Sequence, residues 1–303
     1  MEVLIGTGGW AYFKFPSKSS LKAYSDHFDY VEANNTFYKH PDLRLIQRWR
    51  RSVPKDFTFT VRCHRDLTHK IGLKPVDEAY AVFSLMVRTC RVLDAPFLHL
   101  LTPPSHIFDQ TATKQARAFL STINLKGIRL TWEVRGPLTS ELAALLHDFE
   151  IVHSVDLSRE TPRLVSDVVY TRLFGKGQHN IYQFADEELA AIDKKIRRSG
   201  ARKALVTFHG LKMASDALRF KKFKESGTFM PVTAYTGLDS VKAVLLEDAR
   251  FPSTKAELLT HQGWKIVDIA AETRVHLSQL LSKLPEKTYQ DVQDVIREVR
   301  GFL

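Results

Sequence analysis

The segment from Phe97 to Trp132 holds two short apolar runs, Phe97-Leu-His-Leu-Leu101 and Ile128-Arg-Leu-Thr-Trp132, on either side of Thr113–Ile123, which has helical spacing. Both runs have the length of a strand, and β-branched and aromatic residues are common in them. A strand, a helix and a second strand in this order form the unit from which parallel sheets are built. The segment therefore predicts an α/β fold.

The same unit recurs along the first 208 residues. Six further strand-like runs are Val3–Thr7, Tyr30–Ala33, Phe57–Val61, Ile151–Val155, Val168–Arg172 and Ala204–Phe208. Helical spacing recurs at Ala79–Leu93, Ser140–Phe149 and Glu187–Arg198. Eight alternations of strand and helix predict a (β/α)8 barrel, the TIM barrel. A doubly wound open sheet is the alternative, but the even spacing of the eight runs favours closure.

Composition excludes several classes of protein. The 303 residues are 44% hydrophobic and 11% aromatic, which excludes a disordered chain. The two cysteines, Cys63 and Cys90, cannot form a disulfide framework or a cysteine-rich zinc site. No apolar run has the length of a membrane span, and the opening MEVLIGTGGW resembles neither a signal nor a transit peptide. We therefore expect a cytoplasmic protein with no membrane partner.

The positive charge is concentrated in the first three quarters of the chain. The formal net charge is +10. Residues 1–224 contain 35 basic and 23 acidic residues, a net charge of +12, and residues 225–303 contain 9 and 11, a net charge of −2. A basic body indicates a partner that carries phosphate, with DNA the first candidate. A solvated lysine and arginine surface is the alternative interpretation.

Three carboxylates follow or end predicted strands. In a (β/α)8 barrel the active site forms at the C-terminal ends of the strands, where the sequence places Glu32, Glu133 and Asp156. Two carboxylates at one site can protonate a leaving group and stabilise an oxocarbenium-like centre or activate water. We therefore expect these three residues to be catalytic, with a simple salt bridge to Arg135 as the alternative for Glu133.

Arginines and aromatic residues occupy the same strand ends and the loops beyond them. Arginine suits bidentate recognition of phosphate, and loop aromatics can stack on a base or a sugar. The residues expected to bind substrate are Trp10, Asn34, Tyr38, Arg62, His69, Arg135, Arg172, Tyr182 and His209.

A metal site has less support in the sequence. His64, His69, Glu133, Asp156 and His209 all lie near predicted strand ends, but no His-x-His or His-Glu-x-x-His pattern joins them. A dinucleotide-binding glycine pattern and a Walker loop are missing as well. We therefore expect a site without metal or cofactor, and a divalent metal remains the alternative.

Several motifs together resemble the YecE-like family, domain of unknown function 72. They are Gly6-Thr-Gly-Gly-Trp-Ala-Tyr12, Val31-Glu-Ala-Asn-Asn-Thr-Phe-Tyr38, Thr68-His69, Pro103-Pro-Ser105, Trp132-Glu-Val-Arg135 and Thr171-Arg-Leu-Phe-Gly175. The resemblance covers roughly residues 1–224 and implies a TIM barrel. The family's similarity to the barrel of endonuclease IV implies DNA as a ligand.

The chain also departs from the family pattern. The resemblance implies Lys at Arg62, Gln at Leu101 or Thr102, His at Gly136 and at Phe174, and an Asn pair at His209-Gly210. The carboxylates and the other arginines are kept while several polar partners are lost. A shifted substrate, a different mechanism and weakened catalysis are all compatible with this pattern.

The C-terminal segment is expected to be a separate unit. We predict a barrel over residues 1–224 and a small helical domain over residues 230–303, with Thr254 and Glu257 capping a helix and another helix within Tyr289–Val299. Phe251-Pro252, Leu284-Pro285, Tyr289 and Asp294-Val295 resemble domain of unknown function 2795. A slightly acidic module of this kind suits docking of a protein partner.

Together these features predict a nucleic-acid-acting enzyme, a hydrolase or lyase of nuclease or glycosylase type that acts on damaged or unusual DNA in repair. Two alternatives remain open. One is a non-catalytic nucleic-acid binder whose tail recruits a partner. The other is an enzyme on a small anionic metabolite such as a phosphosugar.

Overall fold

The computed structural model describes residues 1–11 and 20–303, in two compact units. The first unit contains Met1–Leu173 and Lys195–Phe208, and the second contains Phe174–Lys194 and His209–Leu303. The end of the first quoted motif, Tyr12, lies outside the described residues. Among the helices of residues 1–11 and 20–303, none is both long and apolar enough to cross a membrane.

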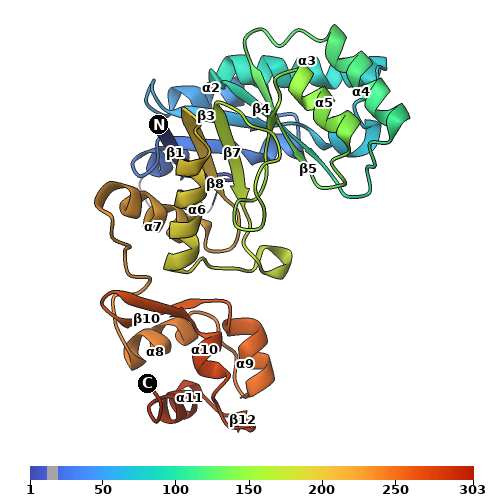
Figure 1. Ribbon diagram of the computed structural model, residues 1–303. Helices are drawn as coiled ribbons and strands as arrows, with labels where there is room; N and C mark the ends of the chain where they lie inside the picture. Colours follow the sequence, from blue (N-terminus) through green and yellow to red (C-terminus); the bar gives the residue numbers. More distant parts are fainter. Residues whose placement is uncertain (12–19) are drawn as a thin grey trace. The chain divides into compact units, whose positions relative to one another are not determined.

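The first unit is built on eight parallel strands, which confirms the α/β class (Figure 1). They are β1 (Glu2–Thr7), β2 (Tyr30–Ala33), β3 (Thr58–Arg62), β4 (Phe97–Thr102), β5 (Arg129–Val134), β6 (Val152–His153), β7 (Val168–Leu173) and β8 (Lys203–Phe208). All eight predicted strands are present. Strands β2 to β6 pair in sequence order in one sheet, and β1, β8 and β7 pair in a second. A bridge between Val155 and Thr171 joins the end of β6 to β7.

Helices connect these strands, as parallel pairing requires. They are α1 (Ser20–Ser25), α2 (Leu43–Arg51), α3 (Asp77–Leu93), α4 (Gln110–Thr122), α5 (Ser140–Asp148) and α6 (Asp186–Arg198), with the short helices η1 (Asn34–Phe37) and η2 (Asp66–Ile71). The four predicted helices are confirmed. Asp109 and Thr139 fix the starts of α4 and α5, because their side chains accept hydrogen bonds from the backbone amides of Ala112 and Leu142.

The two sheets of the first unit share one interior. An apolar cluster contains side chains of β1, β2, β4, β6, β7 and β8, namely Leu4, Tyr30, Phe97, Val152, Val168, Tyr170 and Leu205. The hydroxyl groups of this interior are hydrogen-bonded to one another. Tyr30 on β2 and Thr207 on β8 share a hydrogen bond of 2.7 Å between their hydroxyl oxygens. Thr60 and Tyr170 share one of 2.9 Å. Side chains two residues apart on a strand point to the same side. The next inward positions towards the C-terminal ends are therefore Glu32, after Tyr30, and Arg172, after Tyr170.

The second unit combines helices with short antiparallel pairs. It contains η3 (Gln178–Asn180), most of α6, α7 (Met213–Ser226), α8 (Leu238–Leu246), β9 (Ser253–Thr254), α9 (Lys255–Gln262), β10 (Ile266–Ala270), β11 (Thr273–His276), α10 (Ser278–Leu281), β12 (Thr288–Tyr289) and α11 (Val292–Val299). The predicted capping box of Thr254 and Glu257 is confirmed. Residues 230–303 contain four helices, as a helical segment predicts, and also two strand pairs that were not predicted, β10 with β11 and β9 with β12. Ile266, Val267 and Val275 are β-branched residues that favour strands.

Buried ion pairs connect the C-terminal segment to earlier residues of the second unit. Arg274 on β11 lies 2.7 Å from Asp186 at the start of α6 (Nη1 to Oδ2) and 2.9 Å from Asp268 on β10 (Nε to Oδ1). Arg219 on α7 also pairs with Asp186, and with Asp216 at 3.0 Å. Residues 230–303 therefore share one buried charge network with α6 and α7.

Candidate active site

Arg172 joins two carboxylates at the C-terminal ends of three strands. Its Nη1 donates a hydrogen bond to Oε2 of Glu133 at 2.7 Å, and its Nε lies 3.1 Å from Oε2 of Glu32. All three side chains are buried, and Arg172 is only 1% exposed. We refer to Glu32, Glu133 and Arg172 as the Arg172 cluster. It brings together residues of β2, β5 and β7 that are far apart in the sequence.

The Arg172 cluster holds its charges despite its burial. Burial alone would raise the pKa of Glu133, but Arg172, together with His99 and Arg135, holds it well below the ordinary range of a glutamate. Burial by itself would lower the pKa of Arg172. The two carboxylates, Glu32 and Glu133, outweigh that effect and hold the pKa above the ordinary value of an arginine. At neutral pH Glu133 is therefore a carboxylate, which can accept a proton or stabilise a positive charge but has no proton to give.

Two further residues contact this cluster and were not predicted from the sequence. His99 on β4 shares a hydrogen bond of 2.8 Å from its Nδ1 to Oγ1 of Thr131, and its Nε2 lies 3.6 Å from Oε2 of Glu133. Tyr170 donates its hydroxyl proton to Oε2 of Glu32 at 2.8 Å, and its ring stacks on His99. Burial lowers the pKa of His99, so its ring is neutral at neutral pH. The signal in the sequence was a histidine in the middle of the apolar run Phe97–Leu101.

Arg62 lies beside the cluster with one donor unused. Its Nη1 donates to Oδ1 of Asn34 at 2.7 Å, and its guanidinium carbon lies 3.7 Å from the ring centre of Phe37. Its Nε is buried and has no hydrogen-bond partner among the residues that the structure describes. Burial and the repulsion of Arg172 lower the pKa of Arg62 to about 10, so it stays charged at neutral pH. A buried N–H donor without a partner is costly.

Arg135 adds to the positive charge at this edge, and the uncharged ring of His69 lies beside it. Arg135 donates its Nε–H to Oε1 of Glu133 at 2.7 Å, while its side chain is 41% exposed. The ring centre of His69 lies 4.9 Å from that of Phe37. Burial, then Arg62 and Arg135, lower the pKa of His69, which shows that both cations act on it. We refer to Arg62 and Arg135, together with the uncharged His69 beside them, as the cationic group.

The structure gives the two N-terminal aromatic candidates different surroundings. Trp10 packs edge-on against Trp49, with ring centres 5.1 Å apart, and also against the buried Phe59. Its indole therefore takes part in packing. Tyr38 is 56% exposed and meets only the edge of Phe37 among the ring contacts described. Of the two, Tyr38 has a ring available for stacking.

Three predicted residues are not joined to the Arg172 cluster by the described contacts. Asp156 accepts hydrogen bonds from the backbone amide and the hydroxyl of Ser158, at 2.9 and 2.6 Å, which stabilises its own loop. Tyr182 and His209 belong to the second unit. There the Tyr182 hydroxyl donates to Glu188 at 2.6 Å, and the His209 ring stacks on Phe174.

Metal-binding side chains gather at a different place from the one expected. Within residues 1–11 and 20–303, one group of His, Cys, Asp or Glu side chains has ligand atoms close enough to share an ion: His40, His64 and Asp66. Of the five residues considered from the sequence, only His64 belongs to it. The expectation of a metal-free Arg172 cluster stays a prediction.

Comparison with known sequences identifies a family. The family model described as "Protein of unknown function DUF72" matches residues 4–229. The UPF0759 protein YunF of Bacillus subtilis (strain 168) is 31% identical over 104 residues, which are 32% of this chain and 36% of YunF. The UPF0759 protein YecE of Escherichia coli (strain K12) is 30% identical over 83 residues, 27% of this chain and 30% of YecE. The matched part thus spans about a third of these curated relatives.

Solved structures agree on the fold. A DUF72 family protein from Thermotoga maritima MSB8 superposes with a TM-score of 0.61 at 21% identity, over 75% of this chain and all of that one (100%). SacUVDE, a UV damage endonuclease, superposes with a TM-score of 0.51 at 8% identity, over 75% and 99% of the two chains. At such identities the likeness shows the fold alone. The resemblance of the C-terminal segment to domain of unknown function 2795 stays a prediction.

Proposed function

Because the chain belongs to the DUF72 family of proteins of unknown function, we propose its activity from the site itself: it is an enzyme that acts on DNA, a hydrolase or lyase for damaged or unusual nucleotides. One observation carries this proposal: a guanidinium group that can bind an anion and an ionised carboxylate lie together at the C-terminal ends of the strands. Buried Arg62 has an Nε–H without a partner among the residues that the structure describes, and the ionised Glu133 lies in the Arg172 cluster beside it.

We assign the eight parallel strands to a closed (β/α)8 barrel. The shared interior, the Val155–Thr171 bridge and the hydrogen bond from Tyr30 on β2 to Thr207 on β8 support closure. In such a barrel the C-terminal strand ends form the catalytic face. The Arg172 cluster and the cationic group both lie at that face.

The chemistry follows from the charge states. When the bond between a base and its sugar lengthens, positive charge develops on the sugar. Glu133, kept ionised by Arg172, stabilises that charge or takes a proton from water, and Glu32 supports the same field. Asp156 would first have to leave Ser158, so we assign the electrostatic and base roles to the two glutamates.

The cationic group provides the contact to phosphate. Arg62 and Arg135 can each donate to a phosphate oxygen, and guanidinium groups suit this geometry. Residues 1–224 carry the net charge of +12 that a polyanion would meet on approach. Because Glu32 and Arg172 are buried, a nucleotide in a duplex has to be turned out of the stack to reach them.

The burial of the cluster also favours a second candidate, an enzyme on a small anionic metabolite. A phosphosugar would reach Glu133 without base flipping and would use the same Arg62 contact. Native mass spectrometry of the purified protein distinguishes this candidate. An enzyme on a phosphosugar can retain its ligand through purification and show the added mass of that ligand, whereas an enzyme on DNA would show no such added mass.

A panel of labelled oligonucleotides tests the proposal. The strands carry abasic sites, deaminated bases or unmodified sequence, and are incubated with and without divalent metal or EDTA. We expect product from one damaged class in EDTA, and loss of turnover but not of binding in Glu133→Gln. Glu141→Gln, an exposed glutamate on α5, is the matched control. Absence of product with every substrate contradicts the enzyme proposal, and unchanged behaviour of Glu133→Gln favours a non-catalytic binder.

A further inference from the structure

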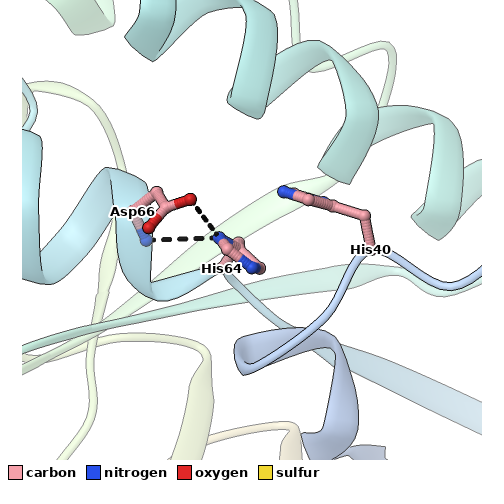
Figure 2. A group of neighbouring side chains, drawn as sticks. All are labelled: His40, His64 and Asp66. Atoms are coloured by element: carbon pink, nitrogen blue, oxygen red, sulfur yellow. Dashed lines mark hydrogen bonds and ion pairs between the residues drawn. The ribbon is translucent and has the colours of Figure 1, made fainter.

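A second group of side chains lies on loops beside the cationic group. His40 follows η1, His64 follows β3, and Asp66 begins η2. Their ligand atoms lie within 4.8 Å of one another. Figure 2 shows His64 and Asp66 linked by two interactions, with the ring of His40 reaching towards them from the other side. None of these side chains contributes to the Arg172 cluster.

His64 brings its Nδ1 to this space. This nitrogen accepts a hydrogen bond from the backbone amide of Asp66 at 3.2 Å, and a bound ion would replace that bond. The ring of His64 is buried, so its position is fixed by the surrounding packing.

Asp66 presents one carboxylate oxygen to the same space. Its Oδ2 lies 3.3 Å from Nδ1 of His64, while its Oδ1 pairs with Lys70 at 2.6 Å. Two ligands placed about 2.0–2.2 Å from a tetrahedral zinc ion are themselves about 3.3 Å apart. The distance between Nδ1 and Oδ2 already has this value, and Lys70 occupies only the other oxygen.

His40 can complete the set if its ring rotates. Its ring now stacks on His64, with ring centres 3.9 Å apart and planes inclined by 23°. A shared ion needs the two ring nitrogens to converge on one point, so the His40 ring must turn out of this stack. His40 is exposed on a connecting segment, which leaves room for that turn.

We infer that His40, His64 and Asp66 form a binding site for a borderline transition-metal ion, with zinc as the type ion. Two imidazoles and one carboxylate prefer such ions over magnesium or calcium, which select oxygen ligands. Three protein ligands leave a further coordination position for water.

Such an ion would connect the loops that carry the cationic group. His40 lies just after η1, which holds Asn34, the partner of Arg62. Asp66 begins the helix that contains His69, and His64 is two residues beyond Arg62. The ion therefore acts on the position of these side chains and is no part of the proposed reaction. This inference stands whether or not the protein acts on DNA, because metal binding is measured without any nucleic acid.

The test is a calorimetric titration of the full chain with zinc chloride near neutral pH, after treatment with EDTA and its removal. We expect one equivalent to bind, and His40→Ala and Asp66→Ala to weaken the affinity at least tenfold. Both positions are exposed or half-buried, so these variants keep the fold, whereas buried His64 is left intact. His147→Ala is the control, because His147 is an exposed histidine that lies next to Asp148.

The outcomes separate clearly. Binding of one ion that is lost in both loop variants and kept in His147→Ala supports the site, and intense visible d–d bands with cobalt would show a four-coordinate ion. No binding by the wild-type chain, or equal affinity in His40→Ala, overturns the inference. Equal binding of magnesium also overturns it, since that ion does not select imidazole.

Discussion

Arg172 and Glu133 form a buried ion pair, with 2.7 Å between Nη1 and Oε2, inside the first unit of the protein. Glu32 holds the other side of the same guanidinium. The sequence predicts Arg172 as a contact to an anionic ligand that nearby carboxylates balance in the empty protein, and it predicts that removal of this arginine leaves folding nearly unchanged. The side chain is only 1% exposed and pairs with two carboxylates, so we instead expect its removal to destabilise the fold.

The first prediction concerns this pair. Arg172→Ala leaves two carboxylates buried without their cation, and breaking a buried pair in this way costs about 3–5 kcal/mol. We expect a loss of that size in the free energy of unfolding, measured with urea. Arg135→Ala, which removes a partly exposed partner of Glu133, should cost about 1 kcal/mol or less. If the two substitutions lower the free energy of unfolding equally, the buried ion pairs of Arg172 do not stabilise the fold more than the exposed pair of Arg135 does.

The second prediction is an acid sensitivity carried by Glu133. Its pKa is depressed in the folded state, so its contribution to stability is present above the unfolded value of about 4.3 and is lost as the pH falls below it. We expect Glu133→Gln to flatten the decline of stability below pH 4.3, measured by urea unfolding at a series of pH values. An unchanged slope in the variant would contradict the depressed pKa.

The third prediction concerns Asp216, whose contribution to stability is lost as the pH rises, opposite to that of Glu133. Burial raises the pKa of Asp216 to about 7, against the opposing effect of Arg219. The folded chain then holds a proton that the unfolded chain releases, so this contribution is present below about pH 4 and is lost as the pH rises towards 7. Asp216→Asn should remove that decline between pH 4 and 7. If wild type and variant follow parallel curves there, Asp216 is ionised in the folded protein.

The fourth prediction concerns the C-terminal segment. Truncation after Lys224 removes Arg274, the partner of Asp186, and also the backbone amide of Ile266 that donates to Oε1 of Gln183 at 2.9 Å. We expect the shortened chain to be insoluble or to unfold at a clearly lower temperature in a thermal scan. Arg274→Ala in the full chain should lower the midpoint in the same direction. A truncated chain with the wild-type midpoint would support the separable module that the sequence indicated.

The fifth prediction concerns Arg62. Arg62→Ala should weaken oligonucleotide binding by about 1–3 kcal/mol, the scale of a hydrogen bond to a charged group, and should lower the salt dependence. Arg62→Lys should not restore the affinity, because lysine has no Nε–H fork. Arg88→Ala on α3, an exposed arginine, controls for net charge in the same fluorescence anisotropy assay. Equal losses in Arg62→Ala and Arg88→Ala would leave Arg62 without a special role.

Local patterns were sufficient for the elements that are continuous in the sequence. Alternating apolar runs gave all eight strands, helical spacing gave α3 to α6, and the Thr254 cap gave the start of α9. These features depend on residues within a few positions of each other. The hairpin of β10 and β11 was missed because its runs are short and lie within a segment of helices.

The sequence predicted only part of the site at the strand ends. The sequence placed Glu32, Glu133, Arg62 and Arg172 at neighbouring ends, since parallel strands end at a common edge. It could not show that Arg172 neutralises both glutamates, or that Asp156 instead bonds to Ser158. Those outcomes depend on which side chains meet across the interior.

The sequence by itself determined the parallel α/β class, the residue types at the strand ends and the basic character of residues 1–224, because periodicity and composition are local properties. Only the tertiary structure decided that Arg172 is buried, that His99 contacts the site, and that His40, His64 and Asp66 lie close together. The same holds for the Nε of Arg62, which has no hydrogen-bond partner among residues 1–11 and 20–303. Each of these depends on distances between residues of separate elements. Burial and charge pairing at such contacts fix the pKa values, and no local pattern records them.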